Sequence, residues 1–329
     1  MKKHIGVAVR IAVSIVLIAF LIRKTSFGSI AHSVRAADPG WLTAGLALGM
    51  LAGAQQAYQW RGLLAAMGLQ RRYLSTLKLD TAARVFDAAL PTSIGGDVVR
   101  IGLAARTRTD RIPAALSVVL RRLMQLPGLV VVLLAGLALS WNLSYVGRVQ
   151  GPAIAFVLAG VGLIAIIGVA SRFKPLEHIR MPAKVRRLPA EWTLARAASV
   201  GGNRPLAHAA VRGLLFWIVV VLSQACYMRA VGIHAPVGYA TVVVATVNAL
   251  SLLPISLGGY GLREGTFSAF LTAGGLATTA QGAAVGAILS IQTLLFGLVG
   301  GLVYLTMRRG DHLPKHASDL GFRPVGGTA

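Results

Sequence analysis

Two short segments of this chain carry a serine, a glycine pair and an arginine in the same order. Residues 90–100 read LPTSIGGDVVR and residues 253–263 read LPISLGGYGLR, which superpose at an offset of 163 positions. Proline cannot continue a helix, glycine frees the backbone, and serine often caps a helix that restarts. A helix N-terminus close to an arginine is suited to binding phosphate or carboxylate. We therefore predict an anion site formed by Ser93, Gly95, Gly96, Arg100, Ser256, Gly258, Gly259 and Arg263.

The composition places these segments in a membrane. The 329 residues are 55% hydrophobic and only 13% charged, with a mean hydropathy of +0.69, whereas soluble domains carry about 25% charged residues. The net charge of +23 comes from basic residues that mostly flank apolar runs. This pattern indicates membrane orientation and contact with anionic lipids, and it argues against nucleic-acid binding. We expect an all-α polytopic membrane protein.

The elements that must position the repeated segments follow from the apolar runs. About 20 apolar residues span a bilayer, and six runs qualify as full spans: 5–22, 41–60, 123–141, 152–170, 211–231 and 282–306. Two further stretches, 75–106 and 238–274, are interrupted by the repeated motif. We predict that each stretch forms a broken or re-entrant helical hairpin.

The orientation follows from lysine and arginine in the short loops. Segment 171–204 carries eight basic residues and only two acidic ones, whereas loops 232–237 and 275–281 carry no lysine or arginine. The basic segment and both termini are therefore expected in the cytoplasm, although loop 23–40 is an exception with three basic residues outside. The first hairpin would enter from the cytoplasmic side and the second from the opposite side.

This assignment makes the repeat an inverted one, as in many secondary transporters. The two copies cover approximately 41–141 and 211–306, within a single bundle formed by residues 1–309. Residues 310–329 form a short tail that we expect to be cytoplasmic and disordered.

Acidic side chains accompany both motifs. Asp80, Arg84 and Asp87 are spaced to share one face of the helix before the first break, while Asp97 and Glu264 follow the breaks. Intramembrane carboxylates are candidates for coupling or gating, and local pairing with the arginines is an equally weighted alternative. For the motif itself, the alternative is that Gly-Gly permits close helix crossing and the arginines reach the interface. The duplication favours a functional site.

The two segments, extended as LPTSIGGDVVRIGLAAR and LPISLGGYGLREGTFSAFL, resemble the lysylphosphatidylglycerol synthase transmembrane-domain family, also called flippase-like. The resemblance covers roughly 5–306. It implies a module of the kind that moves aminoacylated phosphatidylglycerol between leaflets. We expect no aminoacyl-transferase domain of the kind found in the two-part enzymes, so the resemblance does not imply lipid lysylation. Arg121-Arg122 stands where the family often has an acidic–arginine pair, which puts a salt bridge there in doubt.

We therefore expect a flippase-like transporter of the bacterial inner membrane that translocates an anionic-headgroup lipid. The candidates are a phospholipid, aminoacyl-phosphatidylglycerol or a polyprenyl-phosphate-linked lipid. The alternative is a non-transporting partner or regulator of an envelope glycosyltransferase or lipid-modifying enzyme. Scattered histidines, a single cysteine and the absence of a nucleophile or nucleotide motif predict no metal, no cofactor and no enzymatic activity.

Overall fold

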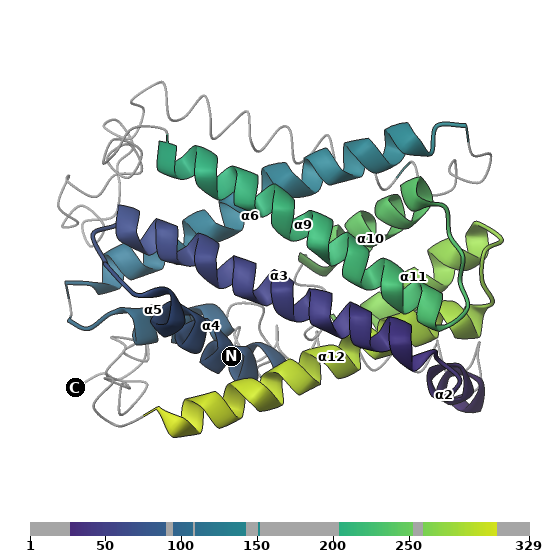
Figure 1. Cartoon of the computed structure of the whole chain (residues 1–329), viewed down its shortest axis with the longest axis horizontal. Helices are drawn as coiled ribbons and strands as arrows, with labels where there is room; N and C mark the ends of the chain where they lie inside the picture. Colours follow the sequence, from purple (N-terminus) through teal and green to yellow (C-terminus); the bar gives the residue numbers. More distant parts are fainter. Residues whose placement is uncertain are drawn as a thin grey trace, which may run out of the picture.

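The computed structural model describes residues 27–89, 95–107, 109–142, 151, 204–252 and 259–307, and its regular structure in this part of the chain is entirely helical (Figure 1). The predicted α class is confirmed for these residues. The predicted spans 5–22 and 152–170, segment 171–204 except for its last residue, and tail 310–329 lie outside them. The helices are α2 (Phe27–Arg35), α3 (Pro39–Ala66), α4 (Tyr73–Ala89), α5 (Gly95–Ala104), α6 (Arg111–Leu139), α9 (Arg204–Ala230), α10 (Val237–Leu252), α11 (Leu262–Ala273) and α12 (Thr279–Thr306).

Four long helices, α3, α6, α9 and α12, form the frame, and two pairs of shorter helices pack between them. The first pair is α4 and α5, and the second is α10 and α11. Helix α3 lies along α9, while α12 contacts α4 and α11, and α6 contacts α5 and α10. Shifting α4 by 163 positions gives 236–252, which matches α10 to within one residue. The offset seen in the sequence therefore also relates helices in the fold.

The two short pairs lie toward opposite ends of the long helices. In Figure 1, α4 and α5 lie toward the left, together with the connections to α3 and α6. Helices α10 and α11 lie toward the right, with the connections to α9 and α12. The two helices of each pair are separated at the motif. Helix α4 ends at Ala89 and α5 begins at Gly95, while α10 ends at Leu252 and α11 begins at Leu262. Residues 90–94 and 253–258, which connect the helices of each pair in sequence, lie outside the described residues.

Local sequence signals explain where two of the long helices begin. The Asp38 side chain accepts a hydrogen bond from the Trp41 N–H (3.0 Å), and Pro39 occupies the first helical position of α3. Thr278 and Gln281 form a capping box at the start of α12. These contacts satisfy N–H groups that a helix N-terminus leaves without partners.

Glycines on α12 let it approach both short pairs. A Cβ added to Gly286 would lie 2.4 Å from the Glu264 Cα on α11, and one added to Gly300 would lie 2.4 Å from the Thr81 carbonyl oxygen on α4. Any larger residue at either position would therefore push the backbone of α12 away from that of α11 or α4. One helix thus holds both short pairs at close range, which fixes the positions of the residues they carry.

The outer surface suits a membrane. Three helices of the described chain are long and apolar enough to cross one, at Arg111–Leu139, Ala207–Ala230 and Thr279–Thr306. They overlap the predicted spans 123–141, 211–231 and 282–306. Large apolar side chains on α12, such as Leu298, Leu302 and Leu305, are exposed, as expected for contact with lipid rather than water. The predicted span 41–60 lies within α3, which has the length but is not among the three.

Candidate functional site

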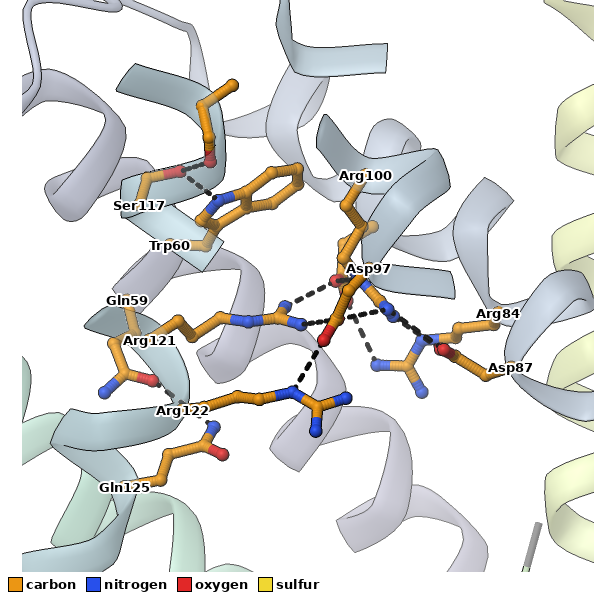
Figure 2. Close-up of polar contacts among 12 residues, drawn as sticks. Gln59, Trp60, Arg84, Asp87, Asp97, Arg100, Ser117, Arg121, Arg122 and Gln125 are labelled. Carbon is orange, nitrogen blue, oxygen red and sulfur yellow. Dashed lines mark hydrogen bonds and ion pairs between the residues drawn. The ribbon is translucent and has the colours of Figure 1, made fainter. Parts of the chain in front are cut away.

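A cluster of charged side chains joins α4, α5 and α6 inside the bundle (Figure 2). Asp80, Arg84 and Asp87 follow one another along α4 at a spacing of about one turn. Asp80 and Asp87 bond to Arg100 of α5, whereas Arg84 lies over the Phe296 ring of α12 at 5.4 Å. On α5, Asp97 and Arg100 are one turn apart and are buried. The predicted local pairing of these residues is present, and it involves more helices than the sequence spacing indicated.

Arg100 is the centre of the cluster. Its Nε donates to Asp80 Oδ1 (2.8 Å), and its two Nη atoms donate to the two carboxylate oxygens of Asp87 (3.1 and 2.6 Å). Nη1 also donates to Asp97 Oδ1 at 3.3 Å. The side chain is 5% exposed. Bidentate pairs of this kind are strong and fix the planar guanidinium in one orientation, so Arg100 is held by three carboxylates.

Two arginines from α6 complete the cluster. Arg121 Nη1 donates to Asp80 Oδ1 (2.8 Å), and Arg122 Nε lies 2.6 Å from Asp97 Oδ2. The salt bridge that the sequence put in doubt at Arg121-Arg122 is therefore formed. The expected acidic neighbour in sequence is replaced by carboxylates on α4 and α5. This pairing depends on tertiary packing, because Asp80 and Asp97 lie far from Arg121 and Arg122 in sequence.

An aromatic side chain supports Arg121 from α3. The guanidinium lies 5.6 Å from the ring centroid of Trp60, which is fully buried. The Trp60 Nε1 donates to the Ser117 hydroxyl at 3.0 Å, one turn before Arg121 on α6. A ring held in this way favours the cation through its π-face and limits how far Arg121 can move.

Gly96 is required where α4 and α5 meet. A Cβ added there would lie 1.8 Å from Asp87 Oδ1 and 2.9 Å from Arg100 Nη1. The glycine pair of the first motif thus makes room for a carboxylate from the neighbouring helix. Asp97 also stands in the first turn of α5, where a negative charge is favoured by the helix dipole. The predicted anion position at this helix end is thus partly filled by the chain's own carboxylates.

The cluster carries a net positive charge and lines a cavity. Arg84, Arg100, Arg121 and Arg122 contribute four positive charges against three negative charges from Asp80, Asp87 and Asp97, which leaves an excess of one. A cavity of about 430 Å³ opens onto it, with all of these except Arg84 and Asp80 in its wall. The Arg122 side chain is 45% exposed. An anion entering this space would meet excess positive charge.

The rest of the cavity wall is mixed. Gln56 from α3, Gln125 from α6 and Ser251 from α10 supply polar groups, while Leu126 and Trp217 supply apolar surface. Residues from both halves of the chain therefore take part. A smaller cavity of about 170 Å³ lies beside it, lined among others by Gln56, Arg84, Gln224 and Gln292. Gln56 lines both cavities, so the two spaces approach each other at this residue.

The second motif is built differently. Gly259 and Gly261 have φ angles of 85° and 79°, in the left-handed region that favours glycine. Gly261 is the N-cap residue of α11. The Glu264 side chain accepts from the Gly261 N–H (2.7 Å) and from the Ser290 hydroxyl on α12. Glu264 therefore caps α11 and joins it to α12, which is a local structural role in addition to the predicted coupling.

Arg263 does not share the cavity with Arg100. Its Nη1 donates to the Thr293 hydroxyl on α12 at 3.1 Å, and within the described residues it forms no ion pair. It is not among the described residues that line either cavity. The predicted binding residues Ser93, Ser256 and Gly258 lie outside the described residues. The part of the chain that the structure describes contains no group of acidic, histidine or cysteine side chains arranged to hold a metal.

These features define a helical membrane protein with a net-positive polar cavity lined by residues of α3, α4, α5, α6, α9 and α10. The chain belongs to the family described as the lysylphosphatidylglycerol synthase TM region, which matches residues 7–301. It is also similar to a glycosyltransferase, AglD, of Haloferax volcanii, with 23% identity over 278 residues. That match covers 72% of this chain and 44% of the relative, so the chain spans less than half of the relative's length.

Proposed function

We propose that this protein moves the headgroup of an anionic lipid across a membrane, with the charged cavity as its binding site. The observation that carries the proposal is the excess of one positive charge on the wall of a cavity inside an apolar bundle. Burying charge in a membrane is costly, and ionisable residues kept there usually serve a pathway or a ligand. A purely structural ion-pair cluster would be expected to balance its charges.

The excess charge also indicates the substrate class. A phosphodiester headgroup carries one negative charge and would make the cluster neutral. Arg122 is the most exposed arginine of the cavity wall, and arginine is well suited to phosphate because its planar fork donates two parallel hydrogen bonds. Gln56, Gln125 and Ser251 could bind hydroxyl groups of the headgroup. The lipid is thus a phospholipid or another phosphate-linked lipid.

The route would run from the charged cavity past Gln56 into the smaller cavity. Arg84 lines the smaller cavity, and its Nη2 lies 3.4 Å from Asp80 Oδ2. Asp80 in turn pairs with Arg100 and Arg121 of the charged cavity. A headgroup passing Gln56 would thus remain close to an arginine. Asp97 is the coupling candidate, because it holds Arg122 at the cavity wall and would release it when the phosphate binds. Asp80, Asp87 and Glu264 hold the surrounding helices in position.

The motif pairs would act as the two halves of an inverted repeat. The matched positions of α4 and α10, and the placement of the pairs toward opposite ends in Figure 1, support this arrangement. Arg61 lies in the last two turns of α3, and Arg71 and Arg72 lie between α3 and α4. Basic residues at this end of the bundle support its placement on the cytoplasmic side. The protein would need no cofactor and would not itself be an enzyme.

Reconstitution tests the proposal. Liposomes containing the protein should allow fluorescent phosphatidylglycerol or a polyprenyl phosphate to reach the opposite leaflet, measured by quenching with a reductant that does not cross the bilayer. Arg122→Gln should lower the rate at least about tenfold, since it removes the excess charge. Arg61→Gln, which changes the same charge outside the cavity, serves as the matched control. If no anionic lipid moves, or if both variants behave alike, the proposal is wrong.

The alternative is a membrane partner of an envelope glycosyltransferase or lipid-modifying enzyme. The similarity to a protein named as a glycosyltransferase, of which this chain spans less than half, favours this second candidate. A partner of this kind would co-purify with an enzyme and stimulate it without moving lipid. In that case Arg122→Gln would leave the stimulation unchanged.

A further inference from the structure

A second cavity lies apart from the charged site, at the end of the bundle where α3 is joined to α4. Its volume is about 450 Å³, and none of its lining residues lines the cavity beside Arg100. Three basic residues enter the wall from separate elements: Arg71 before α4, Lys78 on α4 and Arg106 after α5. No acidic residue is among the described residues that line it.

Two of these cations are available to a ligand. The side chains of Lys78 and Arg106 are exposed and form no ion pair with another described residue. Arg71 is already oriented, because its Nη2 donates to the Ala104 carbonyl oxygen at the end of α5. Ser75, one turn before Lys78 on α4, adds a hydroxyl group to the same wall. Together they form a basic, hydrogen-bonding surface suited to a phosphate group.

The opposite part of the wall is apolar. Leu79 and Leu103 are buried and form the floor, and Val303 and Met307 contribute from the end of α12. Leu79 and Leu103 belong to the same core as Trp60, so packed side chains separate this cavity from the charged cluster. A soluble anion would use only the basic side, whereas an amphiphile would contact both.

We infer that this cavity binds the phosphate of an amphiphile, with Arg71, Lys78 and Arg106 around the phosphate and the apolar floor beneath its glycerol or acyl part. Its place at the end of the transmembrane helices is where lipid headgroups lie. Each basic residue near such a headgroup strengthens binding by about 1 kcal/mol, or roughly fivefold in affinity. The inference concerns a separate site and does not depend on transport through the charged cavity.

Protection of an introduced cysteine tests the site directly. Thr306 lines the cavity and is exposed, so Thr306→Cys in a Cys226→Ser background of the full chain should react with a maleimide in detergent. Short-chain phosphatidylglycerol should slow the reaction, and short-chain phosphatidylcholine should slow it much less. A cysteine at Thr109, which is exposed at the same end but outside the cavity, should show no protection.

Charge variants and a soluble anion complete the experiment. Lys78→Gln with Arg106→Gln should raise the protecting concentration of phosphatidylglycerol at least about tenfold, whereas Arg72→Gln, outside the cavity, should not. Inorganic phosphate should protect only at far higher concentration. Equal protection by inorganic phosphate would overturn the role of the apolar floor. Protection that persists in the double variant, or no protection at all, would overturn the site. Arg122→Gln should leave this protection intact, which separates failure here from failure of the transport proposal.

Discussion

The two copies of the motif share their letters but have different surroundings. Around the first, seven charged side chains meet on α4, α5 and α6. At the same offset of 163, only Arg100 has a charged counterpart, Arg263. The other six positions in the second half are Val243, Val247, Leu250, Tyr260, Ala284 and Val285. The positions of α4 and α10 correspond at this offset, whereas the cluster of ion pairs lies in the first half.

The backbones of the two motifs also differ. Gly95 and Gly96 are the first residues of α5, whereas Gly259 lies in a turn and α11 begins only at Leu262. In the first half, Gly96 makes room for the Asp87 carboxylate because it has no side chain. In the second half the glycines supply positive φ angles, and Glu264 caps the helix. The same residue type thus solves a packing problem in one copy and a conformational problem in the other.

The largest expected difference between the halves comes from the centre of the charge cluster. Asp80→Asn leaves Arg100 and Arg121 buried without their shared carboxylate, and removing one partner of a buried ion pair costs about 3–5 kcal/mol. Val243→Ala, at the corresponding position, removes only apolar contacts worth about 1–2 kcal/mol. Thermal unfolding in detergent, followed by tryptophan fluorescence, measures both. Equal losses would show that the cluster is not stabilised by its ion pairs.

A glycine-to-alanine substitution in each half should give a second, smaller difference in stability. Gly96→Ala places a methyl group against Asp87 and should disrupt its bond to Arg100, at a cost of about 2–3 kcal/mol. Gly265→Ala on α11 meets no atom within 4 Å and should stabilise that helix by about 0.5–1 kcal/mol. The same unfolding measurement compares the two. Destabilisation by both would mean that the contact between Gly96 and Asp87 is not the decisive one.

The smallest expected contrast is in the pH dependence of stability, between Asp110 before α6 and Thr278 before α12. Partial burial acts to raise the pKa of Asp110, but hydrogen bonds from the N–H groups of Thr107 and Arg106 outweigh it and lower that pKa. A carboxyl group with a lowered pKa contributes stability above its unfolded value near 3.8, and this contribution is lost as the pH falls through the folded value. Asp110→Asn should therefore reduce stability at pH 7 and have little effect near pH 3.

Thr278 begins α12 with a hydroxyl group that does not titrate. Thr278→Ala should consequently cost the same at both pH values. Unfolding midpoints of the two variants at pH 3 and pH 7 provide the comparison. A pH-independent loss for Asp110→Asn would contradict the role of its carboxylate.

Much of the arrangement could be predicted from the amino-acid sequence. The breaks between α4 and α5 and between α10 and α11 fall at the motif, where a proline followed by a glycine pair favours a helix break. Asp80, Arg84 and Asp87 could be assigned to one helix face from their spacing alone. The roles of Arg121 and Arg122 could not, because their partners lie about 25–40 positions away in sequence. Gln56 carried no signal, since nothing in its local sequence indicates that it lines two cavities.

The sequence by itself determined the membrane class, the positions of most helices and the duplication, because hydropathy, helix breakers and repeat offset are local properties of the chain. Only the tertiary structure decided which charges meet. It brought three carboxylates to Arg100, gave Arg121 and Arg122 their partners, and placed Arg263 against Thr293 and away from the central cavity. The physical reason is that an ion pair in an apolar bundle depends on which helix faces are packed together, and that packing is set by contacts between distant parts of the chain.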